Sequence, residues 1–543
     1  MTRTDRRTFL KQLSAVTASG AAVPMGLTLS AITEASAQAS PGDYRALVNI
    51  FLYGGNDAYN TVLATDTASW AAYVNQRGGA ADGSSSIALL PAGTAAVSSA
   101  PGNTPQHLGG VRAISKGARA VHAARQFALH PSLAQTQGLY ESGRVAVLAN
   151  VGTLVAPTSK TDWNNAGFTS KPAKLFSHND QQSTWQSFGV EGTTIGWAGK
   201  MADELRALNG VGNANVDLLR DSLTCISPSG TASVWLHGTT VSPMRSDATV
   251  IPGLGTRVNT GSGSVNQVYG SALLHSTMTS FMSTATSTSS LVKDHQSVVK
   301  RGMQINGLLG SSLPSFAQAP WGTAGIGNPW VDMDKLGYTS PVDGIKRINP
   351  LAMQLQMVAR LIDANRVAGL AMKRQFFMVG LGGFDTHDGQ MGAHADRLAQ
   401  LDHALAYFDS VLGQMPSTGD MRANVTTFTS SEFGRSFTNN GDGTDHGWGS
   451  HHFIMGGAVN GKEVYGTFPS YGTVSGSTFT ASDDQIQNGV LLPTTSVDHL
   501  AYTLGRWMGV SANTLVNATP SLSILPNLSN FPAGGRDLGI MKA

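Results

Sequence analysis

Four nearly uniformly apolar runs, each leading into a loop of glycine and polar residues, constrain the fold of this chain more than any other feature. The runs lie within Arg45–Asn60, Gly143–Thr153, Arg374–Gln390 and Arg422–Ser436. A short strand with apolar side chains on both faces is typical of a parallel sheet that is covered on both sides. The sequence therefore predicts a buried, mostly parallel sheet with these four segments among its strands.

Helical patterns precede three of the four runs. Before the last run, apolar residues recur at helical spacing, namely Leu398, Leu401, Leu405, Phe408 and Leu412. A second helix is predicted over Met353–Lys373, and a third over the segment PSLAQTQGLYES. Alternation of helix, apolar strand and polar loop is the pattern of a doubly wound sheet. We therefore expect an α/β fold with a doubly wound, mostly parallel sheet.

Residues 227–349 differ from the rest of the chain because serine, threonine and glycine dominate them. This composition predicts an insertion, which is either a cap near the functional site or a surface excursion without a function. Within it, Met278–Leu309 has the pattern of one long surface helix. Further along the chain, Tyr471–Gln485 has the pattern of a β-hairpin.

The N-terminal residues 1–37 have the pattern of an export signal. Arg6 and Arg7 precede a weakly apolar stretch, and small residues at Ala35–Ala37 suit a cleavage site. The segment resembles a twin-arginine signal; the alternatives are a chance arginine pair before an ordinary secretory signal or a membrane anchor. We expect the twin-arginine export machinery as a partner, a periplasmic or secreted location, and a mature α/β domain over residues 38–543.

Charge and cysteine content exclude several classes of function. The signal segment holds four of the 36 basic and two of the 34 acidic residues, so 32 of each remain in the mature chain. A charge near zero argues against nucleic acid or an anionic membrane as the main partner. No later stretch approaches the ~20 apolar residues that a membrane span needs. Cys225 is the only cysteine, which excludes an intrachain disulfide and a thiolate zinc cage.

Three glycine-rich loops carry aspartate, alone or with histidine, at or near the predicted strand ends. The candidate metal ligands are Asp57, Asp385, His387, Asp445, His446 and either His451 or His452. In doubly wound sheets, ligands bind at the carboxyl ends of the strands. Imidazole with carboxylate suits Zn²⁺ or Mn²⁺, so we expect one or two such ions. Each aspartate alone could instead be a turn residue or a helix cap.

The adjacent histidines cannot both face this site if they lie on a strand. Successive side chains of a strand point to opposite faces, so either His451 or His452 would face the metal. The sequence does not decide between the two.

Five stretches together resemble the bacterial domain-of-unknown-function 1501 family, whose exported members belong to the alkaline-phosphatase-like superfamily with the sulfatases. They are RALVNIFLYGGNDAYNT, KLFSHNDQQSTWQ, GGFDTHDGQ, TFTSSEFGRSFTNNGDGTDHGWGSHHFIMGGAV and PTTSVDHLAYTLGRWMGV. These stretches span Arg45 to Val510. The resemblance implies an alkaline-phosphatase-like sheet and a metal site.

The resemblance also implies roles for individual residues. Asp57 corresponds to the aspartate after the first strand, and Asp445 with His446 to an Asp-His-Gly motif, all on one metal. Asp385 and His387, with a later histidine, would hold the second metal. Ser177 would be the nucleophile. Arg435 would bind a substrate oxyanion, or form an ion pair with Glu432 at a helix start.

The motifs and the resemblance together favour an exported metal-dependent hydrolase or transferase. It would act on a small-molecule or polymeric phosphate, sulfate or related ester through a one- or two-metal Asp/His site. The alternative is a non-catalytic metal-binding protein of the periplasm that acts in envelope or surface assembly. A Ser-His-Asp hydrolase ranks below both, because no Gly-x-Ser-x-Gly elbow lies at a strand–helix junction.

Overall fold

The structure is a computed structural model of the chain. It describes residues 44–78, 86–210, 217–230, 233–246, 248, 272–284, 288–367, 370–475, 478–517 and 523–542. The predicted signal over residues 1–37 lies outside these ranges. Within them, no helix combines the length and the hydropathy that crossing a bilayer would require.

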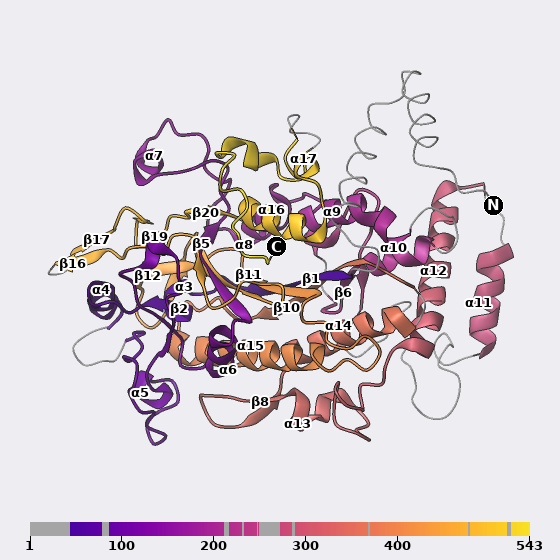
Figure 1. The fold of residues 1–543 in the computed structure, drawn as a ribbon, viewed down its shortest axis with the longest axis horizontal. Helices are drawn as coiled ribbons and strands as arrows, with labels where there is room; N and C mark the ends of the chain where they lie inside the picture. Colours follow the sequence, from indigo (N-terminus) through magenta and orange to yellow (C-terminus); the bar gives the residue numbers. More distant parts are fainter. Residues whose placement is uncertain are drawn as a thin grey trace.

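A central sheet of nine strands organises the fold (Figure 1). Its order is β15 (Val464–Tyr465), β5 (Val145–Gly152), β14 (Ser450–Met455), β11 (Val425–Ser430), β1 (Arg45–Tyr53), β10 (Arg374–Gly382), β6 (Cys225–Ser227) and β7 (Met244–Arg245), with β20 (Thr495–Ser496) also paired to β5. Only the two pairings of β14 are antiparallel. The prediction of an α/β fold with a mainly parallel sheet is confirmed, and the four predicted strands are β1, β5, β10 and β11.

Strand β1 lies inside the sheet between β11 and β10, and apolar cores cover both of its faces. Val48 and Ile50 belong to one core together with residues of α14 (Pro350–Val367) and α15 (Gln390–Leu412). Leu47 and Phe51 belong to the other core with residues of α9 (Trp197–Leu205) and α16 (Val497–Met508). Figure 1 shows these two pairs of helices on opposite sides of the sheet. Burial on both faces explains why β1 reads as an almost continuous apolar run.

The predicted helices are present with shifted ends. α15 contains all five apolar residues of the periodic pattern, and all five are buried. α14 begins three residues before the predicted start and ends at Val367, before β10 begins at Arg374. The segment PSLAQTQGLYES contains α6 (Ala134–Glu141). The predicted hairpin is also present, formed by β16 (Thr473–Ser475) and β17 (Thr478–Thr480).

The region 227–349 is helical in part and contributes one edge strand, β7, to the main sheet. The prediction of one long helix over Met278–Leu309 is wrong, because two helices cover this range, α11 (Ala272–Thr284) and α12 (Ser290–Ser312). α13 (Met333–Leu336) and the hairpin of β8 (Gly337–Thr339) with β9 (Lys346–Ile348) follow. Figure 1 shows α11 and α12 at the opposite end of the molecule from β12 (Arg435–Asn439).

Candidate metal centre

The loops after β1 and β10 touch each other at the carboxyl ends of these neighbouring parallel strands. Gly54 has φ of 117°, and a Cβ atom there would lie 2.3 Å from the backbone nitrogen of Asp385. Only glycine fits such a close approach with positive φ. The glycine pair in the sequence therefore brings the Asp385 loop against the end of β1.

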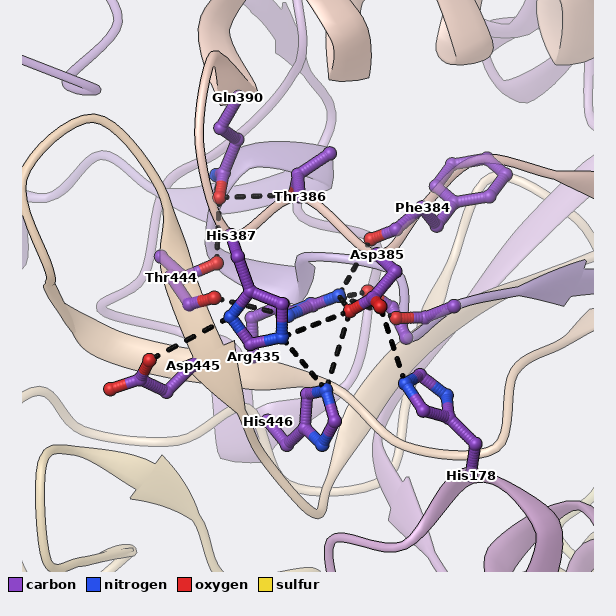
Figure 2. Close-up of polar contacts among 12 residues, drawn as sticks. His178, Phe384, Asp385, Thr386, His387, Gln390, Arg435, Thr444, Asp445 and His446 are labelled. Atoms are coloured by element: carbon purple, nitrogen blue, oxygen red, sulfur yellow. Dashed lines mark hydrogen bonds and ion pairs between the residues drawn. The ribbon is translucent and has the colours of Figure 1, made fainter.

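Four side chains from three segments meet at this place, and we call them the His/Asp cluster: His178, Asp385, His387 and His446. His178 is the first residue of α8 (His178–Ser187), and His446 is the last residue of β13 (Thr444–His446). Asp385 and His387 lie in the loop between β10 and α15. Figure 2 shows the three imidazoles pointing toward the carboxylate of Asp385.

The distances within the cluster are short. His178 Nε2 lies 3.4 Å from Asp385 Oδ2, and His446 Nε2 lies 3.3 Å from Asp385 Oδ1. His387 Nε2 is 3.2 Å from Asp385 Oδ1 and 3.0 Å from His446 Nε2. Among the described residues, His178, Asp385 and His446 form a group whose ligand atoms all lie within 4.8 Å of one another.

Hydrogen bonds at Nδ1, the ring nitrogen away from Asp385, fix the orientation of two of these histidines. His178 Nδ1 is 2.9 Å from Glu432 Oε1, and His446 Nδ1 is 2.7 Å from the carbonyl oxygen of Phe176. Both partners are acceptors, so each Nδ1 carries the hydrogen and donates it. In the neutral imidazole, each Nε2 then presents its lone pair toward Asp385. Metal-bound histidines are held in the same way, by a carboxylate or a carbonyl at the other ring nitrogen.

The donor set fits a divalent metal of the zinc type. Imidazole nitrogens with one carboxylate are common zinc ligands, and a catalytic site keeps a further position open. The cluster meets this second condition, since the side chains of Asp385 and His387 are 45% and 46% exposed. His178, Asp385 and His446 would hold the ion, and the exposed imidazole of His387 is a fourth donor.

Arg435 pairs with Asp385 of the cluster, and its side chain is completely buried. Its Nε donates to Gly55 O at 3.0 Å and its Nη1 to Thr444 O at 3.0 Å. Its Nη2 donates to Gly54 O, to Phe384 O and to Asp385 Oδ1. Arg435 therefore connects the loops that carry the cluster. Because its side chain is buried, it presents no exposed surface to a substrate oxyanion, the role that the resemblance implies.

Neighbouring charges, hydrogen bonds and burial shift the pKa values of the cluster side chains. Partial burial alone would raise the pKa of Asp385, but Arg435, His178 and His387 together lower it below the ordinary value. The hydrogen bond to Glu432 raises the pKa of His178, although partial burial opposes this. Partial burial lowers the pKa of His446. The carboxylate is thus ionised, as a metal ligand must be.

Asp57, expected as a ligand from the resemblance, lies outside the cluster. Its carboxylate is fully buried and paired with Arg77, with Oδ2 2.5 Å from Nη1 and Oδ1 3.1 Å from Nη2. It also accepts hydrogen bonds from Gln390 Nε2 and from the backbone nitrogen of Tyr59. Asp57 therefore caps α3 (Ala58–Thr61) and neutralises a buried arginine.

His451 and His452 lie on β14 and point to opposite faces of the sheet, as two adjacent strand residues must. His451 stacks on Phe468, and His451 Nδ1 accepts the backbone N–H of Asn150 at 3.0 Å. His452 packs edge-on against Trp185. Burial lowers the pKa of both histidines to about 3. The structure places both in the cores, and neither joins the His/Asp cluster.

Ser177 and Asp445 lie at the margin of the cluster. Ser177 Oγ donates to Asp180 Oδ2 at 2.8 Å, and no contact joins this hydroxyl to the cluster among the described residues. Asp445 Oδ1 lies 3.8 Å from His387 Nδ1, on the outer side of that ring. The structure thus brings together Asp385, His387 and His446 from the predicted set, with Asp445 beside them.

His178 is the member of the His/Asp cluster that the sequence patterns do not predict, because in that segment they point to the neighbouring Ser177. One signal could have found it. A histidine opening a polar helix, HNDQQSTWQ, within a stretch shared with the resembled family is a better candidate ligand than the serine before it.

These observations define a class: an α/β protein with a His/Asp cluster at the carboxyl ends of parallel strands. A comparison with protein families adds a similarity for part of the chain. Residues 346–518 match the family model described as "Protein of unknown function (DUF1501)", so this part of the chain is similar to that family. The matched segment contains Asp385, His387 and His446, whereas His178 precedes it. No curated protein is significantly similar to the chain.

Proposed function

We propose that the protein is a metal-dependent hydrolase or transferase acting on a phosphate, sulfate or related ester, with the His/Asp cluster as its active site. One observation carries this proposal. Two imidazoles, fixed at Nδ1 by Glu432 and by a backbone carbonyl, turn their Nε2 atoms toward one exposed carboxylate. A metal held there would keep open positions for water and for an ester oxygen.

The metal ion and the protein side chains have separate roles in the proposed reaction. A divalent ion supplies Lewis acidity and lowers the pKa of a bound water. His178, Asp385 and His446 bind the ion, while Arg435 keeps Asp385 ionised and in place. Attack of water at phosphorus or sulfur forms one new bond to oxygen, the ester bond breaks, and the leaving alcohol takes up a proton.

Water or an acceptor alcohol fits the role of nucleophile better than Ser177 does. The Ser177 hydroxyl is engaged with Asp180 at 2.8 Å, and its carboxylate partner is buried. A serine nucleophile would need a free hydroxyl beside the metal. The reaction we favour therefore needs no covalent intermediate on the chain.

We further propose export by the twin-arginine pathway to the periplasm or beyond. The support is the sequence of residues 1–37, with Arg6-Arg7 before a weakly apolar stretch and a small-residue cleavage site. Fusing these residues to a reporter and replacing both arginines with lysine tests the proposal. Export that persists in the lysine variant, or that the native segment fails to direct, would contradict it.

Elemental analysis and turnover test the enzymatic proposal. We expect protein purified without added metal to contain Zn or Mn, to hydrolyse at least one of p-nitrophenyl phosphate, bis-p-nitrophenyl phosphate and p-nitrophenyl sulfate, and to lose this activity on chelation. His446→Ala should lose metal and turnover together. His295→Gln, at an exposed histidine of α12, is the matched control and should keep both. Undiminished turnover by the metal-free protein would rule the mechanism out.

A non-catalytic metal-binding role is the second candidate, and one observation favours it. Among the described residues, no serine or threonine hydroxyl contacts the ligand atoms of the cluster, so the chain offers no evident nucleophile of its own. Metal bound at one ion per chain with no turnover across the three esters would favour this role over the enzyme.

A further inference from the structure

Glu432 links three parts of the fold through a single oxygen atom. It lies two residues after the end of β11, and its side chain is fully buried. Its Oε1 accepts hydrogen bonds from Gly54 N at 2.9 Å, from His178 Nδ1 at 2.9 Å and from Gln182 Nε2 at 3.1 Å. The end of β1 and the first turn of α8 are therefore held by the same carboxylate.

The two contacts to α8 lie on one face of that helix. His178 and Gln182 are four residues apart, so their side chains are neighbours along the helix surface. Ser177, at the N-cap position, makes no side-chain hydrogen bond to the helix N-terminus. Glu432 instead brings a carboxylate to this end of the helix, where negative charge is favourable. It thereby fixes the position of the turn that carries His178.

We propose that Glu432 is the positioning residue of the metal centre, which selects the Nδ1–H tautomer of His178 and aims its Nε2 at Asp385. The inference rests on the proposed metal-binding function. Glu432 acts through His178 and does not touch the ion itself, because its Oε1 already serves three donors. Its Oε2 lies 3.3 Å from Ser431 Oγ, behind the cluster.

A carboxylate is needed here for a physical reason. Hydrogen bonds to an ionised acceptor are roughly twice as strong as neutral ones, and a carboxylate can only accept, which leaves Nδ1 of His178 no other form than N–H. Glutamine would keep the size of the side chain and one acceptor oxygen. It would lose the charge and bring an amide donor that can face the imidazole.

The decisive experiment compares metal binding in the wild type, in Glu432→Gln and in Glu191→Gln. Glu191 is an exposed residue in the turn after α8 and serves as the charge-matched control. The readouts are Zn²⁺ affinity, from competition with a chromophoric chelator, and the visible spectrum of the Co²⁺-substituted protein. We expect roughly 10–100-fold weaker Zn²⁺ binding and an altered Co²⁺ spectrum in Glu432→Gln only.

The outcomes separate this inference from the proposed function. Equal Zn²⁺ affinity and an unchanged Co²⁺ spectrum in a folded Glu432→Gln protein would overturn the role of Glu432 and leave the metal site standing. Failure of the wild type to bind either ion would overturn the metal site itself. Glu432→Asp, which restores the charge on a shorter side chain, should recover part of the lost affinity.

A measurement on the wild-type chain covers the case in which Glu432→Gln does not fold. Nitrogen-15 labelling of the histidines reports the tautomer of His178 in the metal-free protein, assigned with a His178→Gln variant. We expect hydrogen on Nδ1 above the pKa of this imidazole. A neutral ring with its hydrogen on Nε2 would contradict the proposal, because that nitrogen could not bind a metal.

Discussion

At the scale of single residues, the environment of a side chain decides its role more than its type does. Asp57 and Asp385 both follow strands and glycine pairs in the sequence, yet one is fully buried against Arg77 and the other is 45% exposed beside three imidazoles. The Asp57 oxygens are occupied by Arg77, Gln390 and a backbone N–H, whereas the Asp385 carboxylate keeps an open side. The two environments differ because the partner side chains come from distant segments, and the local spacing of residues does not predict these partners.

Replacing Asp57 with asparagine tests this distinction. The change leaves the buried guanidinium of Arg77 without its counter-ion, and breaking such a pair typically costs about 3–5 kcal/mol of unfolding free energy. We expect urea denaturation to show a loss of this order, with one metal site per folded chain unchanged. Loss of metal from a chain of normal stability would show that Asp57 is a ligand after all.

Arg435→Lys provides a second test at this scale. Lysine cannot direct hydrogen bonds to Gly55 O, Thr444 O and the Asp385 loop at once, because its ammonium is a single point. We expect a loss of roughly 3 kcal/mol in unfolding free energy, measured by urea denaturation. A folded variant of unchanged stability whose KM alone rises would instead favour contact with the substrate.

At the scale of elements, β14 differs from the rest of the sheet in direction and in content. It runs antiparallel to both neighbours, and it places two histidines in the cores. For His452, neither ring nitrogen has a hydrogen-bond partner in the described part of the chain. At neutral pH such a ring contributes packing but no hydrogen bond, and in acid its burial disfavours protonation and so destabilises the folded state.

The pH dependence of stability should reveal these histidines. Burial lowers the pKa of His452 to about 3, so between pH 6.5 and pH 3 the unfolded chain binds more protons than the folded one. Stability therefore falls as the pH falls through this window, by about 2 kcal/mol for this histidine at pH 5. We expect His452→Leu to lose this part of the acid sensitivity in urea denaturation at pH 7 and pH 5.

A control and a contrary result define the test of His452. His295→Gln, at an exposed position, should leave the pH dependence as it is. At pH 7, His452→Leu should be as stable as the wild type or more so, since it removes unpartnered buried nitrogens. An acid sensitivity that stays the same in His452→Leu would contradict the buried neutral state.

The elements could be predicted from the sequence to the extent that their burial is periodic. β1, β5, β10 and β11 read as apolar runs because both faces are covered, and α15 reads as a helix because one face is. The break between α11 and α12 could not be predicted from the sequence, because exposed helices have only a weak periodic pattern of apolar residues. Loop composition predicts Asp385, His387 and His446. For His178 the sequence offers only its place in a stretch shared with the resembled family, and its contact with Glu432, 254 residues away, is visible only in the structure.

At the scale of the whole molecule, the cluster ties together segments that are far apart in the chain. α8, the loop after β10 and β13 each supply at least one side chain of the cluster. An ion that binds only the folded state stabilises it by about 2.7 kcal/mol at one hundred times its dissociation constant. We expect Zn²⁺ at that excess to raise the urea midpoint of the wild type and to leave His446→Ala unaffected. An equal increase in both proteins would place the ion elsewhere.

The order of the ligands along the chain has a consequence for biogenesis. Synthesis runs from the N-terminus, and the chain that has emerged up to α8 possesses one imidazole of the centre and lacks its supporting carboxylate, 254 residues downstream. The cluster is completed only when six of the nine strands of the sheet have been made, since β14, β15 and β20 follow His446 in the chain. On the proposed metal-binding function, chains truncated before β13 should therefore carry no metal at the cluster.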